Sequence, residues 1–299
     1  MSLKTTDVHP ESTISRIRRV CGVDYSGAIA SGKTAWWCQA SVVRRRPGTR
    51  LRVDAIGSLG ESVGSDHRDA VNKFLVQGIV SSDETLWGLD FPFGLPIELG
   101  LGSWSEQLRH LASHAGDAKS LGRSLVARSE AAGFGKHVRR TTDTQTKTPF
   151  DCYHYRIVYQ MFHGMRDVLL PISRRNHVAV LPFQYRRLAT ARVIVAETCP
   201  SSTLKRLSLP HRLYKQTAGK PPTPEQIGVR RLILESLTDA VCGCVDLADE
   251  WVDTMLSDPG GDALDSLIAA VGVFQSFRLV DHAAIARDSR HPVEGCVYA

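Results

Sequence analysis

The stretch RVCGVDYSGAIASGKTAWWCQASVVRRRPGTRLRVDA, residues 19–55, determines the fold class that we expect. Residues 19–24 form a short apolar run, and residues 36–42 alternate between apolar and more polar side chains, which is the period of a strand. After a Pro-Gly turn, residues 51–55 alternate again. Three strands joined by short connections predict an antiparallel meander.

The rest of the chain adds β-α units to this meander. Apolar residues at helical spacing predict three helices: one that begins at Ser65-Asp66, one over residues 225–250 and one after Asp258-Pro259. Short apolar runs predict buried strands over residues 85–90 and 192–197. In the last helix, Asp258 would be the N-cap and Pro259 would take the first position. This order predicts an α/β fold in which a mixed sheet is flanked by helices.

The chain divides into a tail and one domain. Residues 1–15 are polar and predict a loose tail, and residues 16–299 predict a single domain. A basic insertion at about residues 97–190 has a weaker pattern. Within it, the sequence is compatible with helices over residues 101–115 and 151–170 and with a loop over residues 141–149.

Composition excludes several classes of protein. The chain has 299 residues, of which 42% are hydrophobic and 23% charged, as in ordinary globular proteins. It contains no apolar run of the ~18 residues that a membrane helix needs, and its N-terminus lacks the apolar core of a secretion signal. Seven irregularly spaced cysteines fit a reducing compartment. We therefore expect a cytoplasmic protein that does not enter membranes.

Positive charge is concentrated in the middle of the chain. The formal net charge is +6, and residues 117–192 contain 14 Lys and Arg against five Asp and Glu. Such a basic region favours a polyanionic partner such as nucleic acid. A solvated basic surface would have the same composition.

Carboxylates end several of the predicted elements. Asp24, Asp90 and Glu197 each follow an apolar strand, and Asp262 and Asp265 lie three residues apart at the start of the last helix. Mg²⁺ and Mn²⁺ prefer carboxylate oxygens, and two such ions can act on both oxygens of a phosphodiester that is being cleaved. Taken singly, each acid could instead cap a turn or interact with a helix dipole.

Four motifs in this order resemble a known family. They are Val23-Asp24, LDFPFGLP at residues 89–96, ETCP at 197–200 and DALDSLIAA at 262–270. The resemblance is to the domain of unknown function 429 family, described as predicted nucleases with an RNase-H-like fold. It implies acids on the first strand, the fourth strand and the last helix, where Asp24, Asp90, Asp262 and Asp265 stand. A histidine often precedes the first acid of the last motif, whereas this chain has Gly261.

Together these observations predict a metal-dependent phosphodiester hydrolase, a nuclease that uses Mg²⁺ or Mn²⁺. Asp24, Asp90, Asp262 and Asp265 would ligate the metal, and Glu197 would complete the shell or orient a water. The basic insertion would cover the site and contact the phosphate backbone. Further candidates for substrate contacts are Lys33, Arg139, Arg140 and Lys205.

Three alternative functions remain open at this point. Residues 27–34, GAIASGKT, match the P-loop pattern of NTPases, although a P-loop must open a helix and the residues after Thr34 alternate like a strand. A phosphotransferase of the actin and sugar-kinase kind would need two RNase-H-like halves, and this chain shows one set of motifs. A non-catalytic binding module could retain the same fold.

Overall fold

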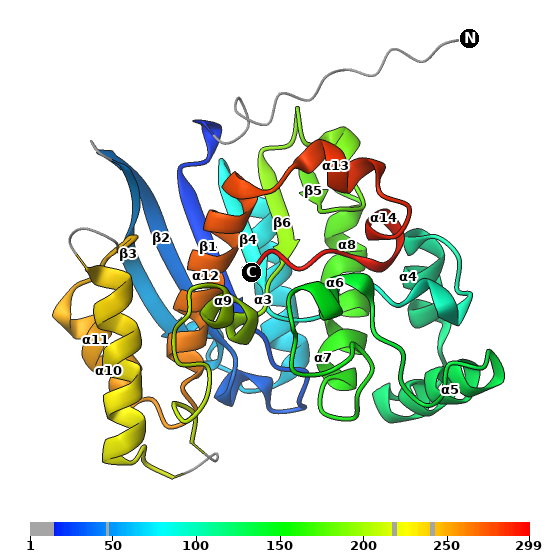
Figure 1. Ribbon diagram of the computed structural model, residues 1–299, viewed down its shortest axis with the longest axis horizontal. Helices are drawn as coiled ribbons and strands as arrows, with labels where there is room; N and C mark the ends of the chain where they lie inside the picture. The colour runs from blue at the N-terminus through cyan, green and yellow to red at the C-terminus, as the bar shows by residue number, and fades with distance from the viewer. Residues whose placement is uncertain (1–14, 46–47, 217–219, 240–242) are drawn as a thin grey trace.

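The computed structural model describes residues 15–45, 48–216, 220–239 and 243–299, so nearly all of the predicted tail lies outside the described residues. These residues form an α/β fold built on a mixed, RNase-H-like sheet with helices on both faces (Figure 1). None of the described helices is both long enough and apolar enough to cross a membrane.

The sheet confirms the predicted meander. The first three strands are antiparallel neighbours, and the parallel strands continue the sheet on the side of β1, in the order β5-β6-β4-β1-β2-β3-β7 over the described residues. At the other edge, β7 pairs in parallel with β3. The strands are β1 (Arg19–Asp24), β2 (Trp36–Arg45), β3 (Gly48–Ser58), β4 (Thr85–Leu89), β5 (Val178–Val180), β6 (Val193–Glu197) and β7 (Val245–Asp246).

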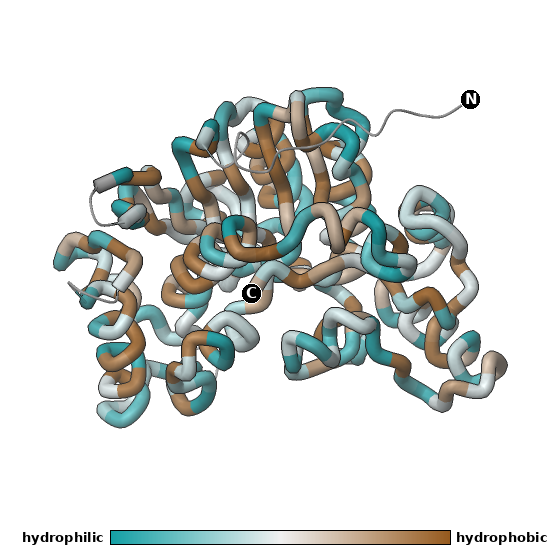
Figure 2. The backbone as a smooth tube through the Cα atoms, turned by 45° about the horizontal axis from the view of Figure 1, so that its top comes forward, coloured by the Kyte–Doolittle hydropathy of each residue, from teal (hydrophilic) through white to brown (hydrophobic). Residues whose placement is uncertain are grey.

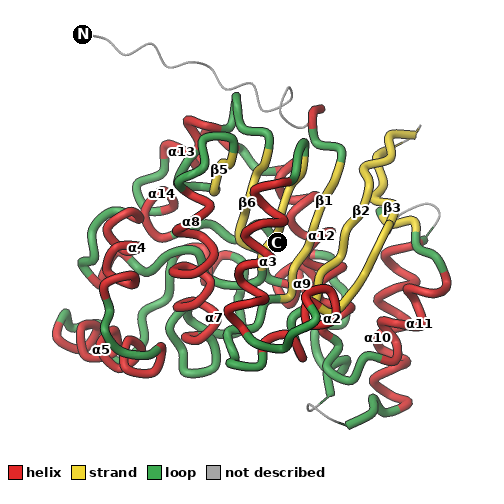
Figure 3. Tube along the Cα trace, turned by 180° about the vertical axis from the view of Figure 1, so that it is seen from behind, coloured by secondary structure: helices red, strands yellow, loops and turns green. Residues whose placement is uncertain are grey.

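Helices cover both faces of this sheet. The helix α12 crosses one face beside α9, and α3 lies on the opposite face, as the view from behind shows (Figure 3). The helices are α2 (Leu59–Val63), α3 (Arg68–Ser81), α4 (Trp104–Ser113), α5 (Ala118–Ala131), α6 (Thr141–Gln145), α7 (Val158–His163), α8 (Leu170–Ser173), α9 (Pro200–Arg206), α10 (Pro224–Thr238), α11 (Asp249–Ser257), α12 (Asp262–Leu279), α13 (His282–Arg287) and α14 (His291–Glu294).

Alternate residues of each central strand enter two different hydrophobic cores. In β4, for example, Leu86 packs with the residues of α12, whereas Trp87 packs with Leu75 of α3. The strands are therefore apolar on both faces, and Figure 2 shows hydrophobic colour along them. Charged residues fit between the two cores only where a strand ends. Asp24 and Glu197 are the last residues of β1 and β6.

Helix α12 approaches β1 so closely that no side chain fits between them at Gly22. A Cβ added to Gly22 would lie 2.1 Å from the carbonyl oxygen of Ser266 and 2.3 Å from the backbone nitrogen of Ala270. On the same face, a Cβ on Gly88 of β4 would lie 2.7 Å from Val273. These glycines therefore fix the distance between the helix and the ends of the two strands.

The P-loop interpretation of residues 27–34 is wrong. Residues Ser31–Lys33 form a single 3₁₀ turn, and the chain then enters β2 and not an α-helix. The amide of Gly32 donates to the carbonyl of Asp66, and those of Lys33 and Thr34 donate to carbonyls within the turn. Since these amides are occupied, the loop cannot cradle phosphates as a P-loop does.

The predicted helix over residues 225–250 is too long. Helix α10 ends at Thr238, and the chain then forms β7 and a separate helix, α11. The guanidinium of Arg50 holds this region by donating to the carbonyls of Gly243 and Val245 and to the carboxylate of Asp246. These contacts are tertiary, so helical periodicity alone could not reveal the break.

The predicted insertion is more helical than its sequence pattern suggests. Helix α4 falls within the predicted range 101–115, and α7 and a π-helical turn at Gly164–Leu169 fall within 151–170. Helix α8 begins at the last residue of that range and continues to Ser173. The loop prediction over residues 141–149 missed α6, and α5 and the short β5 were also not predicted.

The close contact at Gly22 yields a prediction about stability. We expect Gly22→Ala to lower the free energy of unfolding by about 1–3 kcal/mol, because the added methyl group overpacks a rigid contact between backbones. Chemical denaturation followed by circular dichroism measures this change. The matched control is Gly228→Ala in α10, where an added Cβ meets no atom within 4 Å and should stabilise the helix by about 0.5–1 kcal/mol. Equal stabilities of Gly22→Ala and the wild type would contradict the proposed packing.

Candidate functional site

A cavity of about 400 Å³ opens at the edge of the sheet where β1, β4 and β6 end. Its walls come from the ends of these strands, from residues of the insertion and from the loop between α9 and α10. The insertion therefore forms one wall of the cavity. Among the predicted site residues, Asp24, Asp90, Arg140, Glu197 and Asp265 line the cavity.

Asp24 and Asp90 lie at the ends of neighbouring strands. Asp24 is the last residue of β1 and is 6% exposed, and Asp90 directly follows β4. The backbone amide of Asp90 donates to the carbonyl of Val23 over 3.0 Å, which continues the pairing of the two strands up to the acids. The parallel register therefore brings both carboxyl groups to the same edge.

Asp262 and Asp265 occupy the first turn of α12, as the sequence predicts. The helix begins three residues later than we predicted, because Gly261 and not Asp258 is the N-cap. Gly261 has a φ of 79°, a left-handed conformation that favours glycine at this position. The side chain of Asp258 still caps the helix by accepting the amide of Ala263 over 3.1 Å.

The sequence did not reveal the residue around which the aspartates gather. The Lys215 ammonium lies 3.8 Å from Asp24 Oδ2 and 3.5 Å from Asp262 Oδ1, and it forms a still closer ion pair with Asp265 Oδ2. The neighbouring hydroxyl of Tyr214 donates to Asp265 Oδ1 over 2.8 Å. The sequence predicted only a loop here, and a single lysine in a loop carries no recognisable signal.

A buried arginine holds the two segments that meet at this lysine. Arg230, on α10, has no solvent exposure, and its Nε donates to the carbonyl of Tyr214 over 2.7 Å. Its terminal nitrogens donate to the carbonyls of Asp258 and Pro259, just before α12. Arg230 therefore connects the Lys215 loop to the start of the helix that carries Asp262 and Asp265.

Burial and mutual repulsion make ionisation of these acids unfavourable. Burial raises the pKa of Asp24 well above its ordinary value, and Asp262, Asp265 and Asp90 add to the increase, while Lys215 partly offsets it. Burial and then Asp265 raise the pKa of Asp90 to about 8. The pKa of Asp262 is also raised, chiefly by burial.

Lys215 remains a cation in this environment. Crowding by protein atoms lowers its pKa, but the carboxylates of Asp265 and Asp24 outweigh this effect and hold the pKa well above its ordinary value. Its side chain stays 45% exposed, so it reaches the acids from the side of the solvent. The Lys215 ammonium therefore supplies a positive charge that stabilises the carboxylates of the site.

Glu197 lines the same cavity but is bound to Arg140. The guanidinium of Arg140 donates to both oxygens of Glu197, at 2.5 and 2.8 Å, and also to both oxygens of Asp143. The amide of Phe93 donates to Glu197 as well, over 2.9 Å. Arg140 is 1% exposed and all its nitrogens are engaged, so our prediction that it contacts substrate is wrong. The pair instead ties the insertion to the end of β6.

The other predicted substrate contacts are Arg139 and Lys33, which are exposed, and Lys205, which is half-buried. Arg139 donates to the carbonyls of Thr148 and Pro149, two residues of the cavity wall. Lys205 donates to the carbonyl of Lys147 over 2.6 Å. Lys33 lies 4.0 Å from Asp66 and does not belong to the described lining of the cavity.

The donor set fits a divalent cation once the ammonium moves. Within the described ranges, no group of three or more His, Cys, Asp and Glu residues is arranged to hold a metal ion as it stands. The acids that converge offer only carboxylate oxygens, however, which are the donors that Mg²⁺ and Mn²⁺ prefer. The raised pKa values of Asp24 and Asp90 indicate that added positive charge would stabilise the cluster.

Comparisons with known proteins found no matching family model, no matching curated protein and no matching solved structure. The resemblance to the domain of unknown function 429 family therefore stays a prediction.

The raised pKa of Asp90 predicts a pH-dependent effect of its removal. A carboxyl group whose pKa is about 8 in the folded protein and about 3.9 when unfolded destabilises the fold as it ionises. This destabilisation of the folded state is absent below pH 4 and grows as the pH rises to about 8. We therefore expect Asp90→Asn to raise the melting temperature at pH 8 in metal-free buffer and to change it little at pH 4. The increase should be roughly 2–4 °C for each kcal/mol by which the free energy of unfolding rises.

Differential scanning calorimetry at both pH values checks this prediction. Asp253→Asn is the matched control, because Asp253 is exposed on α11, and this variant should melt like the wild type at both pH values. A gain of the same size at pH 4 and pH 8 would contradict an abnormal pKa of Asp90.

Proposed function

We propose that the protein is a phosphodiester hydrolase that acts on nucleic acid and depends on Mg²⁺ or Mn²⁺. The observation that supports the proposal is the gathering of Asp24, Asp262 and Asp265 around one cationic nitrogen, at the edge of an RNase-H-like sheet. Acids that are drawn together in a buried place without a metal need another counter-ion, and Lys215 supplies it.

In this proposal Asp24, Asp90, Asp262 and Asp265 hold the metal. When bound, the ion would stabilise negative charge on the attacking and leaving oxygens of the phosphodiester. The residues of the chain fix where this happens: the strand ends place Asp24 and Asp90, and the first turn of α12 places the other two acids. Lys215 has to leave its central position, and its ammonium is then free to interact with a phosphate.

Glu197 has a different role from the one that the sequence suggested. Since both its oxygens are bonded to Arg140, it does not ligate the metal in this proposal. It keeps the wall of the cavity in place, and it also accepts the amide of Phe93, three residues after Asp90. Two exposed basic residues of the loop between α9 and α10, Arg212 and Lys215, line the same cavity, which suits a polyanionic substrate.

Cleavage assays with matched variants test the proposal. Wild-type protein should cleave DNA or RNA with Mg²⁺ or Mn²⁺ and poorly with Ca²⁺, because Ca²⁺ takes more ligands at longer distances. Asp24→Asn should lower the rate by about 100-fold or more, since it removes a ligand charge and keeps the shape of the side chain. Single-stranded, duplex and branched substrates should be compared.

Asp253→Asn, on the exposed surface of α11, is the control for this assay and should cleave as fast as the wild type. Equal cleavage by Asp24→Asn and the wild type would contradict the assigned site. If no substrate is cleaved with either metal, the non-catalytic binding module becomes the better explanation.

A further inference from the structure

A second and larger hollow, of about 560 Å³, lies next to the candidate site along helix α5. Aromatic and basic side chains dominate its lining. We call it the tyrosine groove and define it by Lys119, Arg123, His137, Tyr153, Tyr155 and Tyr159. Glu130 is an acid that also lines it. The candidate site as described above does not use these side chains.

A row of contacting rings leads from Phe150, in the wall of the aspartate cavity, to Tyr155 in the tyrosine groove. Phe150 stacks on His154 with ring centroids 4.6 Å apart, and His154 lies 4.4 Å from Tyr155. The Arg156 guanidinium lies 5.6 Å from the centre of the Phe150 ring and 5.7 Å from that of Tyr155. Tyr155 is 70% exposed, so its ring is available to a ligand.

The charge of this region suits an anion. Lys119, Arg123, Lys136 and Arg156 are exposed, and among the described residues none of them forms an ion pair with a carboxylate within 4 Å. Unpaired cations beside exposed aromatic rings match a ligand with alternating phosphates and flat bases. An apolar peptide would leave these charges without partners.

One segment of the chain forms the wall between the groove and the candidate site. Phe150, Asp151 and Ile157 line the cavity of the aspartates, whereas Tyr155 and Tyr159 line the groove. A nucleic-acid strand that lies in the groove therefore needs to cross only this wall to reach the aspartates. His137 and Asp151, with Nδ1 and Oδ2 3.2 Å apart, connect the two sides.

We propose that the tyrosine groove binds single-stranded nucleic acid and directs it to the aspartate cluster. The inference rests on the proposed function and specifies its substrate class. Single strands are favoured because ring faces such as that of Tyr155 can stack only on bases that are not already stacked in a duplex. The basic side chains contact the phosphates, which makes binding dependent on salt.

Fluorescence anisotropy with labelled single-stranded DNA, single-stranded RNA and duplex DNA tests this inference in EDTA, where metal-dependent cleavage cannot occur. We expect tighter binding of at least one single strand than of the duplex. Tyr155→Ala should weaken that binding about tenfold, and Tyr155→Phe should retain it, because stacking needs the ring and not the hydroxyl. Arg156→Ala should weaken binding and lower its salt dependence.

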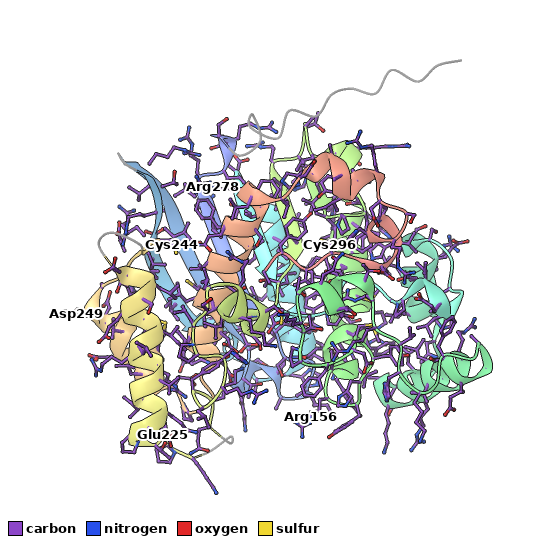
Figure 4. The ribbon with its side chains drawn as sticks, in the orientation of Figure 1. Arg156, Glu225, Cys244, Asp249, Arg278 and Cys296 are labelled. Atoms are coloured by element: carbon purple, nitrogen blue, oxygen red, sulfur yellow. The ribbon has the colours of Figure 1, made fainter. Side chains whose placement is uncertain are left out.

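Arg278→Ala is the matched control for Arg156→Ala. Arg278 also lies over an aromatic ring, that of Phe274 at 5.2 Å, but at the far end of α12. Figure 4 shows Arg278 in the upper part of the molecule and Arg156 near its lower edge. This control should bind like the wild type. Unchanged affinity of Tyr155→Ala, or a preference for duplex, would overturn the inference.

The assay separates this inference from the proposed function. If the wild type binds single strands through Tyr155 but cleaves nothing, the groove is supported and the hydrolase proposal fails. If the wild type cleaves nucleic acid and Tyr155→Ala binds as tightly as the wild type, the groove fails and the hydrolase proposal stands.

Discussion

The contact between the backbones of α12 and β1 at Gly22 fixes the geometry on which the rest of the structure depends. Because Gly22 has no side chain, the carbonyl of Ser266 can approach the strand to a point only 2.1 Å from where a Cβ would lie. This contact sets the first turn of α12 beside the end of β1. Asp262 and Asp265 therefore meet Asp24, although more than 200 residues separate them in the sequence.

This packing brings several like charges together, and a nearby cation partly balances them. Several acids share a poorly hydrated edge of the sheet, and their pKa values rise because burial and like charges oppose ionisation. Lys215 balances part of this charge, and Arg230 keeps its loop in place through the carbonyl of Tyr214. A protein that needed only stability could have avoided acids here, which supports our proposal that the cluster is a functional site.

The sequence predicted those parts of the fold and site that depend on local patterns. Period-two alternation located the meander, and an acid after each apolar run located Asp24 and Asp90. The end of α10 could not be predicted, because it depends on distant contacts of Arg50 with residues around β7. Lys215 was missed for the same reason, since only the folded chain brings its loop to the acids.

Diffraction from crystals soaked in Mn²⁺, with data collected for anomalous scattering, shows whether the clustered aspartates bind a metal ion. We expect an anomalous peak between the carboxylates of Asp24, Asp90 and Asp265, with Lys215 Nζ displaced from its present position among them. The peak should be absent in Asp24→Asn crystals soaked in the same way. A cluster without any peak at saturating Mn²⁺, with Lys215 still paired to Asp265, would contradict the claim that these acids form a metal site.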